Sequence, residues 1–451
     1  MYTLPLLLVI VVALFVTSSK NGLGSFVTLG IFGAAVYTVP ALVDTQVSLG
    51  SVASRVGYVS VPPEVDFVVL VAWLGLLAGL LLSTAAFPRI RHVDTRQAID
   101  PTTRSVAVAS AIIGWAGVIY FMYSQGSVLF FLQERMEQNA GPFATLWKWA
   151  AMFGLVSALL ARDTRLLYLN GAILVLIFLR GDRTLVAIST AAMVIVASYR
   201  NPGWWKRLRV PQIIGLVFAA AVVFLGKTVY LNVKSGLTGQ GWDVTRGLTY
   251  TQQLMSQFEP FATFNHIEFV MRTGITIPPV EFLWSIFGNL LLVPSFFGVS
   301  TNVYNTTVTA AMSGRLGFGV AGNYLAHGYA VGGILGAALF YFMLPIMLRI
   351  CDGQFRNQTG TVKVFWCCVG AVIAFYVHRN GLDNLLSFVR QLFIVAVATA
   401  GIAAVLRQFG LVGTGRSLRV ASPFNTRRRQ EEDFVLSRLP GGKATSTSGD
   451  H

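Results

Sequence analysis

Residues 164–199 read TRLLYLNGAILVLIFLRGDRTLVAISTAAMVIVASY, and this segment sets the class of the protein. It is apolar almost throughout and long enough for two membrane helices of about 20 residues each. The interruption Arg180-Gly181-Asp182-Arg183 predicts a turn between them. Of the 451 residues 54% are apolar and 12% are charged, whereas soluble proteins carry roughly 25% charged residues. We therefore expect an all-α polytopic membrane protein.

Other apolar segments along the chain also have the length of membrane helices. They lie at residues 3–17, 24–43, 65–85, 105–123, 143–161, 212–231, 329–348, 364–378 and 386–406. Together they predict about eleven transmembrane helices. We expect a transmembrane domain over 1–406, which includes an extracytoplasmic loop at 232–327. A basic, disordered cytoplasmic tail is expected over 407–451.

The net charge of +15 arises from 34 Lys and Arg against 19 Asp and Glu. If the tail is cytoplasmic, most of the cations fall in cytoplasmic segments, as the positive-inside rule requires. The charge excess therefore reflects topology, and no nucleic-acid partner is expected. The chain lacks a phosphate-binding loop and metal-ligand spacings, so we expect neither a metal site nor another cofactor.

Arg180 and Arg183 are candidate ligands for a diphosphate. An arginine at membrane depth costs about 3 kcal/mol or more, so it normally faces a cavity or a partner. Two guanidinium groups three residues apart point the same way on a helical turn, and their fork geometry suits phosphate oxygens. The alternative is that both side chains reach the interface, with Asp182 as a local partner.

The segment His378-Arg379-Asn380-Gly381-Leu382-Asp383, followed by Arg390, is the second candidate site. At about 100° per residue, Arg379, Asp383 and Arg390 fall within about 40° on one helix. Such a charged stripe indicates the wall of a polar cavity. A purely structural ion pair between Arg379 and Asp383 is the alternative.

The loop at 232–327 is too long to lack structure of its own. Its apolar piece Ile286–Phe297 is too short to span a membrane, so we expect a re-entrant or interfacial segment. Glu259 and His327 are candidates for a general base toward a sugar hydroxyl, and Arg315 is a candidate substrate ligand. For any single one of these loop residues, ordinary solvation is the alternative and the more common explanation.

The chain resembles the bacterial polysaccharide repeat-unit polymerases of the Wzy class, which include the O-antigen and enterobacterial common antigen polymerases. Four features carry the resemblance. The first two are the Arg-bearing break Leu179–Thr184 and the loop residues Phe258-Glu259-Pro260. The others are Val293-Pro294-Ser295, which precedes the Gly-rich run 317–333, and Arg379-Asn380-Gly381-Leu382-Asp383, which Arg390 follows seven residues later. The family tends to have acidic or polar residues in the Gly-rich run, where this chain has Asn323 and His327.

The resemblance implies a fold related to membrane-embedded glycosyltransferases that use lipid-linked donors (GT-C-like). It implies metal-independent joining of undecaprenyl-diphosphate-linked oligosaccharide units on the outer face of the bacterial cytoplasmic (inner) membrane, with lipid diphosphate leaving. The lipid-linked glycan is then both donor and acceptor, and a chain-length regulator protein is a further partner. The implied roles are catalysis for Glu259, His327 and Arg379, and diphosphate or substrate binding for the other candidates. Those are Arg180, Arg183, Arg315, Asp383 and Arg390.

Two other functions fit the same pattern. An O-antigen ligase would bind the lipid diphosphate with arginines in the same way but transfers the glycan to another acceptor. A transporter or flippase for a lipid-linked glycan would bind its cargo with the same arginines, although paired inverted repeats would be expected and none is evident.

Overall fold

The computed structural model describes residues 2–21, 24–47, 58–87, 101–125, 146–179, 182–201, 259–291, 297–298, 301–312 and 322–412. Within these ranges the chain is almost entirely helical. A two-residue antiparallel pair, β1 (Gln46–Val47) with β2 (Tyr58–Val59), is the described exception, and in it Gln46 pairs with Val59.

The first half of the described chain supplies seven helices: α1 (Thr3–Asn21), α2 (Phe26–Leu42), α3 (Pro63–Ala86), α4 (Pro101–Gln125), α5 (Leu146–Ala161), α6 (Thr164–Leu179) and α7 (Arg183–Arg200). The second half supplies α10 (Glu259–Thr273), α11 (Pro279–Leu290), the π-helical η5 (Asn305–Thr309), α13 (Tyr324–Asn357), α14 (Gly360–Tyr376), the 3₁₀ turn η6 (Val377–Arg379) and α15 (Leu382–Gln408). The predicted break within 164–199 is confirmed, because α6 ends at Leu179 and α7 begins at Arg183.

Five helices of the described chain are long and apolar enough to cross a membrane. They cover Pro63–Ala86, Thr102–Ser124, Tyr324–Asn357, Gly360–Arg379 and Leu382–Gln408. Shorter apolar helices accompany them. The expected polytopic helical membrane protein is thus confirmed at this level, while the predicted span 212–231 and most of the tail 407–451 lie outside the described residues.

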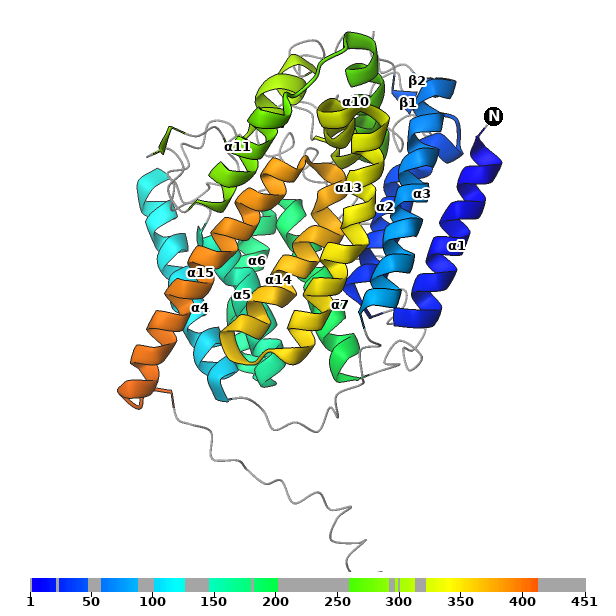
Figure 1. Ribbon diagram of the computed structural model, residues 1–451. Coiled ribbons are helices and arrows are strands. Elements are labelled where there is room, and N and C mark those ends of the chain that lie inside the picture. The colour runs from blue at the N-terminus through cyan, green and yellow to red at the C-terminus, as the bar shows by residue number, and fades with distance from the viewer. Residues whose placement is uncertain are drawn as a thin grey trace, which may run out of the picture.

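The long helices run alongside one another as a bundle, and α10 and α11 lie at the end where α13 and α15 begin (Figure 1). Close packing within the bundle depends on small residues. A methyl group at Gly79 of α3 would clash with the carbonyl oxygen of Phe342 in α13, so glycine lets the two backbones approach. This packing holds α13 in place, and α13 carries one of the candidate site residues.

Helix α13 is broken near its start, at Gly332 and Gly333. Gly333 has φ 59° and ψ −144°, a conformation open essentially only to glycine. The chain turns back there, so Gly328 and Gly336, which eight residues of straight helix would hold about 12 Å apart, come into contact. The first turns of α13, which carry His327, are therefore a separate short helical piece.

One sequence-based prediction about local structure is wrong. Arg379, Asp383 and Arg390 do not share one helix: Arg379 ends η6, Gly381 is extended at φ −66° and ψ 166°, and α15 begins only at Leu382. The extended backbone interrupts the helical hydrogen bonds, so only Asp383 and Arg390 lie on one helix. The apolar piece 286–297 is described only in part: its first residues belong to α11, which begins earlier, at Pro279, and leaves Leu283, Trp284 and Phe287 exposed. The expectation of a re-entrant or interfacial segment therefore stays a prediction.

Candidate functional site

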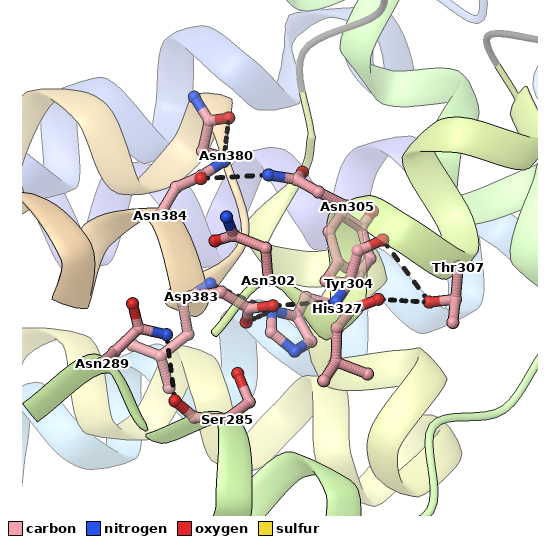
Figure 2. A network of polar contacts seen from close by, with 12 residues as sticks. Ser285, Asn289, Asn302, Tyr304, Asn305, Thr307, His327, Asn380, Asp383 and Asn384 are labelled. Atoms are coloured by element: carbon pink, nitrogen blue, oxygen red, sulfur yellow. Dashed lines mark hydrogen bonds and ion pairs between the residues drawn. The ribbon is translucent and has the colours of Figure 1, made fainter. Parts of the chain in front are cut away.

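A buried polar cluster lies at the end of the bundle that carries α10 and α11, where Tyr304, His327 and Asp383 meet (Figures 1 and 2). Asp383 Oδ2 accepts a hydrogen bond of 2.8 Å from the backbone N–H of Tyr304. Its other oxygen, Oδ1, lies 3.4 Å from His327 Nδ1. His327 is 1% and Asp383 3% exposed. The cluster thus joins the starts of α13 and α15 to the segment that precedes η5.

Local structure positions each of these side chains. The side chain of Asn323 caps α13 by accepting hydrogen bonds from the backbone N–H groups of Leu325 and Ala326, which fixes the first turn that bears His327. Asp383 lies in the first turn of α15, where the helix dipole stabilises a carboxylate. Both side chains therefore sit at helix beginnings that face the same cluster.

The hydrogen bonds fix where the imidazole proton lies. The backbone N–H of Leu382 donates to His327 Nδ1 at 3.0 Å, so Nδ1 is an acceptor and the ring of neutral His327 carries its proton on Nε2. Nδ1 and Asp383 Oδ1 are then two acceptors facing each other. Protonation of Asp383 Oδ1 would relieve the repulsion between these two acceptors, so the contact favours uptake of a proton by the carboxylate.

Aromatic rings enclose His327. Its imidazole stacks on Tyr304 with ring centroids 4.6 Å apart, and Phe282 and Phe340 lie at 5.5 and 5.4 Å. Tyr304 OH and His266 Nδ1 of α10 are within hydrogen-bond distance at 3.1 Å. Burial raises the pKa of the Tyr304 hydroxyl above its ordinary value, so Tyr304 stays neutral. The cluster therefore runs from α10 through Tyr304 to the Asp383–His327 pair.

The turn that bears Arg379 lies against the beginning of α7. Arg379 Nη1 donates to Thr184 Oγ1, across 195 residues of sequence, and its guanidinium lies 6.0 Å from the ring centroid of Tyr376. Asp182, in the predicted Arg-bearing break, forms an ion pair of 2.9 Å with Lys148 of α5. The structure thus brings the segment around Arg379 next to the end of the break between α6 and α7.

Arg390 lies further along α15, beneath the end of α11. Its Nη1 donates to the carbonyl oxygens of Gly288 at 3.2 Å and Leu291 at 3.3 Å, and its Nη2 to Ser387 Oγ at 3.4 Å. No carboxylate of the described chain forms an ion pair with Arg390. Arg390 therefore caps the C-terminal end of α11, and these bonds use only part of its five donors.

The remaining predicted site residues are described partly or not at all. Arg180 and Arg315 lie outside the described residues, and Arg183 and Glu259 are described only as the first residues of α7 and α10. Within the described ranges no group of three His, Cys, Asp or Glu side chains is placed to hold a metal ion.

Sequence reasoning missed Tyr304 and the partners of Lys148 and Thr184. Tyr304 and Lys148 belong to no motif and Thr184 ends the Arg-bearing break 179–184, and each joins the site through a contact with a segment far away in sequence. A single buried tyrosine in a loop gives no pattern to detect. Lys148, a cation near the start of a predicted apolar helix, could have been considered as a partner for Asp182 from the sequence.

The fold and the site together define a polytopic helical membrane protein with a buried polar cluster at one end of its bundle. No family model, curated protein or solved structure matches the chain. The role of the cluster therefore has to be argued from its geometry.

Proposed function

We propose that the protein is a glycosyltransferase that polymerises undecaprenyl-diphosphate-linked oligosaccharide repeat units on the outer face of the bacterial cytoplasmic membrane. The observation that carries this proposal is the contact of Arg379 with Thr184. It gathers cation-bearing segments from two distant parts of the chain at the end of the bundle that also holds the Asp383–His327 pair. This combination of cations and a proton acceptor suits transfer from a diphosphate leaving group.

The reaction needs one bond to form and one to break. A hydroxyl oxygen at the non-reducing end of the acceptor unit attacks the anomeric carbon of the donor glycan, and the bond from that carbon to the diphosphate oxygen breaks. Negative charge then accumulates on the lipid diphosphate, where preplaced guanidinium groups stabilise the transition state. Arg379 and Arg390 fill this role in the proposal, together with Arg180, Arg183 and Arg315.

The acceptor hydroxyl must also lose its proton. In the proposal the Asp383–His327 pair receives it, because Asp383 Oδ1 and His327 Nδ1 face each other without a proton of their own. Glu259 at the start of α10 is the alternative base. His327 alone is the weaker candidate, since the Leu382 N–H already occupies the lone pair of Nδ1.

The proposal includes the finer architecture expected from the sequence. About eleven spans with a large external loop, related to GT-C-like transferases, would place the site at the outer side of the bilayer. The lipid-linked glycan is donor and acceptor, a chain-length regulator is a further partner, and no cofactor takes part.

The test uses the full chain in lipid nanodiscs with purified lipid-linked repeat unit as sole substrate. A ladder of longer lipid-linked products supports a polymerase. Product formation only after addition of lipid A-core identifies a ligase instead. Movement of the unmodified lipid across liposome membranes, without new glycosidic bonds, identifies a transporter and overturns the proposal.

A further inference from the structure

Five asparagine side chains gather beside the Asp383–His327 pair (Figure 2). We refer to Asn289, Asn302, Asn305, Asn380 and Asn384 as the amide cluster. They come from α11, the segment before η5, η5 itself, the turn before α15, and α15. Carboxamides from three separate stretches of an otherwise apolar chain therefore converge on one place, next to the proposed reaction centre.

Part of the amide cluster is joined by internal hydrogen bonds. Asn305 Nδ2 donates to Asn384 Oδ1 at 3.0 Å, and Asn384 Nδ2 donates to Asn380 Oδ1 at 2.9 Å. Asn289 Nδ2 donates to the backbone oxygens of Ser285, at 3.0 Å, and Thr301. These bonds hold the amides in defined orientations across α11, η5 and α15.

Two amide oxygens of the cluster are left over. Asn289 Oδ1 and Asn302 Oδ1 are both buried, and no described residue donates a hydrogen bond to either. Asn289 is 0% exposed. Figure 2 shows the Asn302 side chain near Asn384 and Asp383, with no dashed line to its amide. A buried acceptor without a donor is unfavourable, so hydrogen-bond donors supplied by a bound molecule would stabilise these two oxygens.

The chemistry of the cluster selects the ligand. Carboxamides both donate and accept, which matches hydroxyl groups, since these do the same. A divalent cation would require several carboxylates, and a phosphate would favour guanidinium or ammonium groups. The amide cluster has neither kind of group among its five members. A neutral molecule dense in hydroxyl groups satisfies it best.

We infer that the amide cluster is a carbohydrate subsite, and that it holds the terminal sugar of the acceptor unit. This inference rests on the proposed function. The backbone N–H of Tyr304, two residues after Asn302, bonds to Asp383, and Asn384 follows Asp383 directly in α15. A sugar ring bound by Asn302 and Asn384 would therefore present a hydroxyl group to the Asp383–His327 pair. Hydroxyl donors of that ring would fill the acceptor positions at Asn302 and Asn289.

The test separates the sugar from the lipid diphosphate. The probes are the free repeat-unit oligosaccharide, released from its lipid by mild acid, and undecaprenyl diphosphate without sugar. Binding of each is measured to the full chain in nanodiscs, with Asn302→Ala and Asn384→Ala as variants. Each variant should weaken oligosaccharide binding about fivefold to tenfold and leave undecaprenyl diphosphate binding unchanged. Asn302→Ala is the milder change, because no described residue bonds to the Asn302 amide.

Asn170→Ala is the matched control. Asn170 is more buried than Asn302 and Asn384, and its Oδ1 also lacks a donor, but its amide nitrogen bonds to Ala107 O and Leu166 O within the α4–α6 region. Both probes should therefore bind to this variant as they do to the unaltered chain. Unchanged oligosaccharide binding in both cluster variants overturns the subsite, even if polymerisation stands. Binding of neither probe to the unaltered chain removes the proposed function as well. Parallel loss of both probes in a variant shows a structural role and also overturns the subsite.

Discussion

Replacement of Asp383 tests the proposed chemistry most directly, because asparagine and alanine at this position perturb it differently. In Asp383→Asn the amide oxygen still accepts the 2.8 Å bond from the Tyr304 N–H, and the amide nitrogen replaces one of the two acceptors that face each other at His327 Nδ1. The free energy of unfolding should therefore change by less than about 1 kcal/mol. The variant cannot take a proton, however, so transfer should fall on the order of 100-fold to 10,000-fold.

Asp383→Ala removes both interactions. The buried N–H of Tyr304 then loses its acceptor, which costs about 1–3 kcal/mol, and the unfolding temperature should fall as well as the activity. The assays are thermal unfolding in detergent and single-turnover extension of lipid-linked repeat unit. The reasoning is refuted if Asp383→Asn retains near-normal transfer, since the carboxylate would then have only a structural part. It is also refuted if asparagine and alanine destabilise the fold equally.

Three further changes test other parts of the structure. Arg379→Lys and Arg390→Lys keep the positive charge but lose the two-pronged donor geometry of the guanidinium group, so each should reduce polymer formation on the order of 100-fold. Polymer formation is measured from product ladders, and full activity in both variants would show that these arginines do not bind the diphosphate. Gly333→Ala should lower the free energy of unfolding by about 1–3 kcal/mol because of its φ of 59°, whereas Gly353→Ala, at a helical position with open space around it, should be neutral or stabilising; equal melting curves would contradict the strained turn. A double-mutant cycle of Lys148→Met with Asp182→Asn should give a coupling energy of about 1–3 kcal/mol in the free energy of unfolding. Additive effects of the two substitutions would show that the ion pair does not contribute to stability.

Most of the helices could be predicted from local sequence. The helices α3, α4 and α6, for example, fall within a few residues of the apolar runs at 65–85, 105–123 and 164–179. Burial of apolar side chains and the need to satisfy backbone groups inside a membrane act on each run of about 20 residues separately. The charged break at 180–183 was visible for the same reason.

The candidate site was only partly predictable. Arg379 and Asp383 were singled out by their charges in an apolar setting, but the assumption of one continuous helix gave them the wrong geometry. The extended Gly381 separates them, so Asp383 faces His327 and Arg379 faces α7. The amide cluster was missed because carboxamides carry no charge and its members are scattered between 289 and 384.

Hydropathy along the chain was therefore sufficient for the class of protein, for most helix positions and for the residues whose charge is costly in a bilayer. The partners of those residues followed only from the packed bundle: Asp383 with His327 and Tyr304, Lys148 with Asp182, and Arg390 with the end of α11. The physical reason is one of range. Helix formation in a membrane is decided by neighbours within a few turns, whereas the pairing of polar groups depends on which distant helices pack together.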